Sequence, residues 1–320
     1  MGAATVAAIL TLAVLSLGWG TYPVAPDAVI RALLGSGTAL DTTVVVGWRL
    51  PRVLAAVALG ALLAIAGALF QTVTRNPLAS PDILGLSNGA FTGMLVTLVL
   101  VSSSWPARAA GALVGCLAAS LLIWLLAYRG GIQGFRLIVV GIGVSAMLAS
   151  LNTWMLLQVE LETAMFASAW GHGSLNGVTG DALGGVLLCA MPVALAAFAL
   201  VPSLRQLELG DDLATATGVR PHLVRSVALL IGVVLVAAAT AIAGPIAFVA
   251  LAAPQIARRL ARSPSLSLTL SGLVGALVLL ASDAIAQHVL PVALPVGVVT
   301  VSVGGAYLIV MIVSEIRRRA

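Results

Sequence analysis

The composition of this 320-residue chain excludes an ordinary soluble domain, because 61% of its side chains are apolar and only 8% are charged. Soluble domains are near half apolar and about a quarter charged. The formal net charge is +5, and all 16 basic residues are arginine. A chain without lysine cannot carry a Walker A phosphate-binding loop or form a lysine Schiff base. The sequence therefore predicts an all-α, polytopic membrane protein without a P-loop of its own.

Apolar runs predict about ten membrane-spanning helices in a single transmembrane domain, residues 1–320. A spanning helix needs about 20 residues, and the first run lacks the basic segment and cleavage site of a signal peptide. In chain order, the predicted spans are residues 3–18, 53–70, 90–103, 109–127, 137–157, 183–202, 226–243, 246–257, 267–284 and 296–313.

The block 226–257 is too long for one crossing. As a single helix it would measure about 48 Å, against a hydrocarbon core of about 30 Å. Gly244 and Pro245 interrupt it, and proline breaks a helix because it lacks the backbone donor. We therefore expect two crossings. Because the second leg is short, part of it should be extended chain buried within protein.

The placement of the arginines predicts how the chain is oriented in the membrane. With ten spans both termini lie on one side, and twelve arginines fall on that side against four on the other. Basic residues in short loops mark the cytoplasmic side. The sequence thus predicts a multi-pass protein of the inner or plasma membrane with both termini in the cytoplasm. The four outer arginines are Arg31, Arg49, Arg52 and Arg108.

No residue set predicts an enzyme, a metal site or a cofactor. Residues 85–89 match G-x-S-x-G, but that motif needs a strand-to-helix turn and a partner histidine, so a Ser-Gly turn opening a membrane helix is the preferred interpretation. An intramembrane hydrolase based on Ser87 is the alternative. The remaining candidates, His172, His222, His288, Cys116 and Cys189, lack metal-ligand spacing.

A polar stretch at about 204–225 differs from every other connection. Asp211 or Asp212 is suited to cap a short helix that ends at Gly218. Such a helix on the cytoplasmic face suits docking against another protein, and a merely solvated loop is the alternative.

Two arginines at the outer mouth of a span, Arg49 and Arg52, form the densest positive feature outside. They are suited to pair with carboxylates of an external partner, or to reach lipid headgroups by snorkelling. Inside the spans the sequence shows almost no fixed charge, with Asp283 near an outer end. Ion-coupled carriers usually place such groups at the midplane, so a large substrate driven by a separate subunit is favoured over a self-contained secondary carrier.

Several motifs, in order and at near-constant spacing, resemble the FecCD-type permeases of ferric-siderophore, haem and cobalamin ABC importers. The motifs are RLPR at 49–52, RNPLA at 75–79, GLSNGA at 85–90, GHGSL at 171–175, GDD at 210–212, GPIAF at 244–248 and LPVGVVT at 294–300. The resemblance implies a type II ABC importer permease fold. It also implies a second permease subunit, identical or a sister chain, two ABC ATPase subunits on the cytoplasmic face, and an extracytoplasmic substrate-binding protein.

The resemblance also implies which residues dock the binding protein, form the gate and couple to the ATPase. Arg49 and Arg52 match arginines that pair with binding-protein glutamates, and Asn76 and Leu78 match the translocation gate. The residues matching the helix that couples to the ATPase are Glu208, Gly210, Asp211, Asp212, Ala214 and Gly218.

Departures from the family pattern leave the substrate open. Gln287 and His288 stand where an arginine is common, Ala293 replaces a glutamate, Gln255 replaces a frequent histidine, and His172 replaces an apolar residue. The resemblance implies import of a ferric siderophore or similar bulky iron complex, with cobalamin or haem as the alternative cargo. It implies no catalytic residue, no metal site and no nucleic-acid partner.

Overall fold

The computed structural model describes residues 1–128, 134–263, 265–289, 292 and 294–319. The described part is helical and contains no strand, which confirms the predicted all-α fold. Its elements are α1 Gly2–Gly18, α2 Pro26–Leu33, α3 Ala39–Thr42, the π-helical segment η1 Thr43–Arg49, α4 Leu50–Thr74, α5 Leu86–Leu100, α6 Trp105–Ala127, α7 Gly134–Gln158, α8 Leu161–Gly171, α9 Gly180–Ala199, α10 Val201–Glu208, α11 Asp211–Ala216, α12 Pro221–Ala243, α13 Val249–Ala261, α14 Leu268–His288 and α15 Val296–Arg319.

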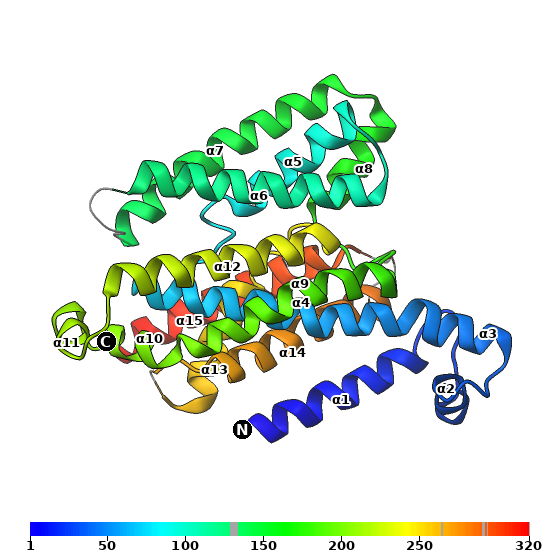
Figure 1. Ribbon diagram of the computed structural model, residues 1–320. Helices are drawn as coiled ribbons and strands as arrows, with labels where there is room; N and C mark the ends of the chain where they lie inside the picture. Colours follow the sequence, from blue (N-terminus) through cyan, green and yellow to red (C-terminus); the bar gives the residue numbers. More distant parts are fainter. Residues whose placement is uncertain (129–133, 264, 290–291, 293, 320) are drawn as a thin grey trace.

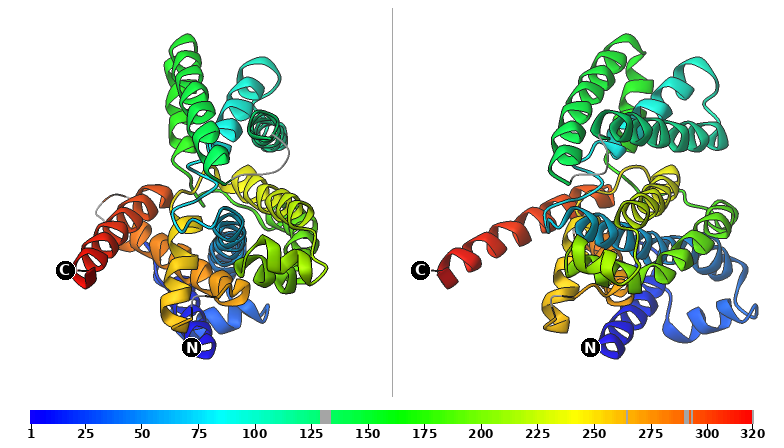
Figure 2. Two further views of the ribbon diagram at one scale, coloured as in Figure 1. Left: turned by 90° about the vertical axis from the view of Figure 1, so that its left-hand side faces the viewer. Right: turned by 60° about the vertical axis from the view of Figure 1, so that its left-hand side comes forward.

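The helices form two groups. Figure 1 shows α5, α6, α7 and α8 together above the rest of the molecule, and Figure 2 shows α15 reaching away from both groups. In the larger group α4 is central, because it packs against α12, α13 and α14. We call the end with α2, α3 and η1 the α3 end, and the opposite end, with α10 and α11, the α11 end.

Small residues allow the helices to approach closely, as is usual in membrane bundles. A side chain at Gly67 of α4 would overlap the backbone of Ala250 in α13. Similarly, Gly93 of α5 lies against Gly111 and Gly115 of α6. The Gly and Ala content of the chain is therefore used at the interfaces between helices.

Within the described residues, six helical stretches are long and apolar enough to cross a membrane. Three shorter apolar helices and α13 occupy the other predicted spans. The six stretches are Ala39–Thr74, Trp105–Ala127, Gly134–Gln158, Gly180–Ala199, Pro221–Ala243 and Leu268–His288.

Two boundaries were predicted wrongly. The helix containing the second span begins at Ala39, because the apolar Val44 and Val45 are buried and continue the helix towards Arg49. The Leu50 amide donates to the carbonyl of Val45, which is the wide spacing of a π-helical turn. Between the predicted spans 137–157 and 183–202, where no helix was predicted, lies helix α8, Leu161–Gly171, whose Trp170 stacks on Phe91 with ring centroids 6.1 Å apart.

The predicted break near Pro245 is confirmed. Helix α12 ends at Ala243, α13 begins at Val249, and both Gly244 and Phe248 have positive φ angles, 70° and 69°. Ile246 between them is buried. Non-helical chain is thus enclosed by protein at this point, as a bilayer requires.

Candidate docking, coupling and gate sites

Arg52 at the α3 end is paired inside the protein. Its Nε donates to Oδ2 of Asp283 at 2.7 Å and its Nη2 to Oδ1 at 2.6 Å, and Nη1 donates to the side-chain oxygen of Asn176. The Asp283 side chain is only 8% exposed. A two-pronged arginine–carboxylate pair is strong and directional, so it joins α4 to α14.

Arg49, one turn earlier, is held differently. Its guanidinium donates to the carbonyl oxygens of Leu17 at 2.8 Å and Tyr22 at 2.6 Å. Among the residues that the structure describes, no carboxylate lies within ion-pair distance of it. Gly20 lies against the guanidinium, where a side chain would collide with it. The positive charge of Arg49 is therefore oriented but not neutralised.

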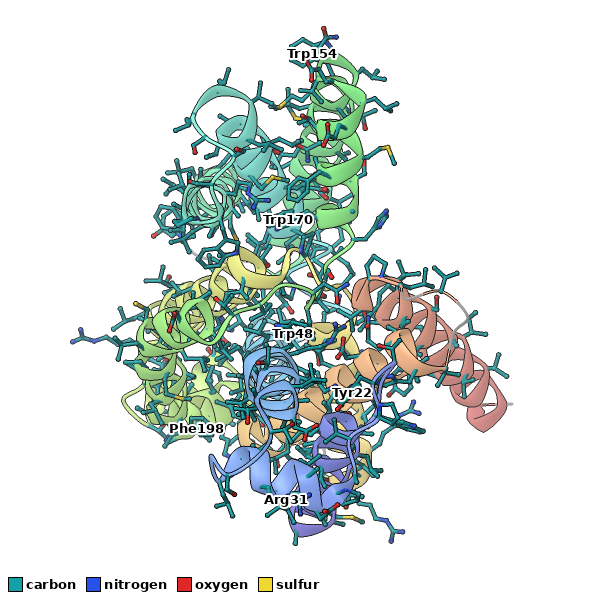
Figure 3. The ribbon with its side chains drawn as sticks, turned by 90° about the vertical axis from the view of Figure 1, so that its right-hand side faces the viewer. Tyr22, Arg31, Trp48, Trp154, Trp170 and Phe198 are labelled. Carbon is teal, nitrogen blue, oxygen red and sulfur yellow. The ribbon has the colours of Figure 1, made fainter. Side chains whose placement is uncertain are left out.

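Both arginines line a cavity of about 630 Å³ at the α3 end. Figure 3 looks onto this end and shows Tyr22 and Trp48, which also line the cavity. His288 lies in its wall and stacks on Trp19 with centroids 5.7 Å apart. The cavity gathers side chains from α1, η1, α4 and α14 that are far apart in sequence. Gln287, the other departure noted in this segment, also lines it.

The polar stretch at the α11 end forms two short helices, α10 and α11. Helix α11 ends before Gly218, whose φ of 86° suits glycine. Gly210, with φ of 118°, precedes the helix in place of an aspartate cap, so the predicted Asp cap was wrong. Asp211 and Asp212 instead occupy the first turn, where the helix dipole favours negative charge. Ala214 lies on the buried face of α11 and is fully buried.

Asp211 accepts hydrogen bonds from two arginines of different elements. Arg225 of α12 donates from Nη1 at 2.9 Å and from Nη2 at 2.6 Å. Arg75, directly after α4, donates from Nη2 at 2.6 Å and also reaches the carbonyl of Leu207 at 2.9 Å. The hydrogen bonds from Arg225, with the charges of both arginines, hold the pKa of Asp211 below its usual range.

Glu208 ties the same region to the start of α14. Its Oε1 accepts the amide of Leu266 at 3.2 Å. Burial raises the pKa of Glu208, while this hydrogen bond and the charges of Arg258 and Arg205 oppose the rise. The six predicted coupling residues thus lie together at one end of the bundle.

The predicted gate residues, Asn76 and Leu78, lie in a turn, residues 75–79, that follows α4 at the α11 end. The Asn76 side-chain oxygen accepts the amide of Leu78 at 2.9 Å, and the Leu78 side chain is 47% exposed. The Nε2 of the buried Gln255 in α13 donates to the carbonyl of Pro77 at 2.8 Å. The turn is therefore attached both to α13 and, through Arg75, to α11.

Sequence reasoning overlooked Asp82. This carboxylate lies in the irregular chain between α4 and α5 and accepts the hydroxyls of Ser80 and Ser87, each at 3.1 Å. With His172 it lines a cavity of about 480 Å³. The sequence could have indicated Asp82 as a candidate, because this acid lies outside the apolar runs. In the described residues no hydrogen bond joins Ser87 to His172, so the serine–histidine pair of a hydrolase is not formed.

Comparison with known proteins gives consistent matches over the whole length. The model of the FecCD transport family matches residues 8–314. The ferric enterobactin transport system permease protein FepG of Escherichia coli is 48% identical over 98% of this chain and 96% of its own length. The achromobactin transport system permease protein CbrC of Dickeya dadantii is 35% identical over 98% and 92%.

A solved structure agrees with the fold. It is described as an inward-facing conformation of a metal-chelate type ABC transporter and superposes with a TM-score of 0.86 at 24% identity, covering 98% of each chain. At that identity the likeness concerns the arrangement of helices, and it agrees with the type II permease fold that the motifs implied.

Proposed function

This chain belongs to the FecCD transport family, and from that membership we propose that it is the membrane permease subunit of an ATP-driven importer for a ferric siderophore or a similar bulky iron complex. The observation that carries the proposal is the full-length similarity to permeases named for ferric enterobactin and achromobactin. The chain is a multi-pass membrane transport subunit and not an enzyme. Hydrolysis of ATP takes place on a separate subunit.

The alternatives are less well supported. Cobalamin or haem would be carried by the same fold, but the relatives compared above are named for siderophores. A self-contained secondary carrier would need an ionisable group that is exchanged during transport. Asp283, the acid in a predicted span, is already paired with Arg52.

The two ends of the bundle suggest where partners bind. We place two ATPase subunits at the α11 end, which is then cytoplasmic together with both termini, and an extracytoplasmic binding protein at the α3 end. A second permease subunit, identical or related, completes the pathway, and residues 1–320 form one transmembrane domain. The exposed Asp212 supports the first assignment and the unneutralised charge of Arg49 supports the second.

A sequence of movements follows from this placement. ATP binding draws the ATPase subunits together and moves α11. Because Arg75 is bonded to α11 in the conformation described, a movement of α11 changes the contacts that hold the turn with Asn76 and Leu78, and the pathway opens or closes.

The test is uptake of radioactive ferric enterobactin into proteoliposomes that contain the complex purified with its own ATPase and binding protein. We expect uptake that requires ATP and survives an ionophore. Uptake that continues without the ATPase but collapses with the ionophore would contradict the proposal in favour of a secondary carrier. Competition by haem or cobalamin, and not by other ferric siderophores, would redirect the substrate assignment.

A further inference from the structure

The contacts of Asp211 are unequal, although both of its partners are arginines. The pair with Arg225 is two-pronged, and the Arg225 side chain is only 10% exposed. The pair with Arg75 uses a single nitrogen, and the Arg75 side chain is 48% exposed. Two-pronged, buried arginine–carboxylate contacts are the stronger ones, whereas exposed single contacts contribute little and break readily. A force on α11 would therefore break the Arg75 contact first.

Arg75 lies where such a break would matter. It follows the last residue of α4 with a left-handed backbone, φ 50°, and directly precedes Asn76. Among the described residues, its Nη2 donates to α10 and α11, through the Leu207 carbonyl and the Asp211 carboxylate. The position of α11 is thus transmitted to the first residue of the gate turn.

The far side of the same turn is held by a different helix. Gln255 of α13 donates to the Pro77 carbonyl at 2.8 Å, and Gln71 of α4 donates to the Leu251 carbonyl of α13 at 3.0 Å. Gln71, Gln255 and Leu251 are buried in the bundle, whereas Pro77 is exposed. If α11 moves while α13 stays in place, residue 75 loses its contact while residue 77 keeps its own, and the exposed Leu78 lies next to this change.

We propose that Asp211 is the positioning residue that links the ATPase-facing helix to the gate, with Arg225 as its permanent anchor and Arg75 as its releasable contact. This inference rests on the proposed function. It specifies that α11 stays attached to α12 throughout the cycle. The Asp211–Arg75 contact is made in the conformation described and is broken in the other.

The experiment compares Arg75→Gln with Arg75→Lys in the purified complex in proteoliposomes, measuring ferric enterobactin uptake and ATP hydrolysis in the same samples. We expect the glutamine variant to assemble and hydrolyse ATP, with uptake per ATP falling about tenfold, inside the range typical of coupling between sites. Lysine keeps the charge and a donor nitrogen, so it should recover most of the loss. A purely structural role would lower assembly, hydrolysis and uptake together.

The matched control is Arg262→Gln, which removes an exposed arginine directly after α13 and should leave uptake per ATP unchanged. A second test is Asp211→Asn, which weakens both contacts and should uncouple at least as strongly as Arg75→Gln, whereas Asp211→Glu should uncouple less. The linkage is overturned if Arg75→Gln matches Arg262→Gln, or if uptake and hydrolysis fall by the same factor. Failure of the proposed function is distinguishable, because the unmodified complex would then show no ATP-driven uptake.

Discussion

The two ends of this molecule use the same chemical pair in opposite ways. At the α3 end one carboxylate, Asp283, meets one guanidinium, Arg52, in a nearly buried contact between α4 and α14. At the α11 end Asp211 is shared by Arg75 and Arg225, and its side chain is 43% exposed. A buried one-to-one pair fixes the distance between two helices. A carboxylate that is exposed and shared by two arginines can lose one contact and keep the other. Burial and the number of partners therefore distinguish a contact suited to hold two helices together from one suited to break and re-form.

The largest expected effect comes from breaking the buried pair. Asp283→Ala leaves the guanidinium of Arg52 without its counter-charge, and removing one partner of a buried pair costs about 3–5 kcal/mol of stability. Thermal unfolding of the detergent-solubilised protein measures the loss. The double variant with Arg52→Ala should be less destabilised than the single one, because no buried charge is left unpaired.

The control for this experiment is the exposed pair of Asp27 and Arg31, whose side chains are 64% and 56% exposed. Asp27→Ala should cost less than about 1 kcal/mol. Equal losses of stability from Asp27→Ala and Asp283→Ala would contradict the distinction between buried and exposed pairs on which the comparison depends.

An intermediate effect is expected from reversing the charge of Arg49 at the α3 end. Arg49→Glu reverses a charge that has no carboxylate partner in the part of the chain that the structure describes. The affinity for the binding protein should therefore fall at least tenfold, which corresponds to about 1.4 kcal/mol. The Kd of the binding protein for the permease in nanodiscs measures this fall. Arg31→Glu reverses an arginine of the same end that already has a partner, and it should change the Kd less. An unchanged Kd for Arg49→Glu would contradict the docking role.

The smallest effect is a pH dependence at the α11 end. The pKa of Asp211 is lowered in the folded protein, so its charged form contributes stability that is complete above the ordinary aspartate value of about 3.9. That contribution is lost as the pH falls below this value and through the folded pKa. The protection of the α11 amides against hydrogen exchange, measured relative to the intrinsic exchange rate at each pH, should therefore fall on acidification below about pH 4. In Asp211→Asn this protection should be low at every pH, and a wild-type profile in that variant would contradict the assignment.

The sequence predicted those features of the structure that depend on the residues at that same position in the chain. The break at Gly244 and the end of α11 at Gly218 were predictable, because glycine and proline limit the backbone of the very residues they occupy. Local reasoning missed helix α2, the helix between Ala39 and Arg49, and helix α8, since polar residues interrupt their apolar pattern.

The ion pairs were beyond prediction for a different reason. Arg52 and Asp283 are separated by 231 residues, and Arg75 and Asp211 by 136. Each of these residues was visible as a charge, but its partner is set by how α4 packs against helices far along the chain. The sequence therefore predicted that Arg49 and Arg52 lie at the same end of a span. It did not predict that Arg52 pairs with a carboxylate while Arg49 contacts backbone carbonyls.

The π-helical segment η1 has a consequence for insertions and deletions. A π-helical turn holds one residue more than an α-helical turn, so deleting one residue within Thr43–Arg49 would return the segment to α-helical spacing with little change in the direction of α3 relative to α4. The carboxylate of Asp41, which accepts the Tyr22 hydroxyl at 3.2 Å, would then stay near that partner. An inserted residue that extends the helix at ordinary α-helical spacing would instead turn α3 by about 100°, so an insertion in this segment is expected to be tolerated less well than a deletion.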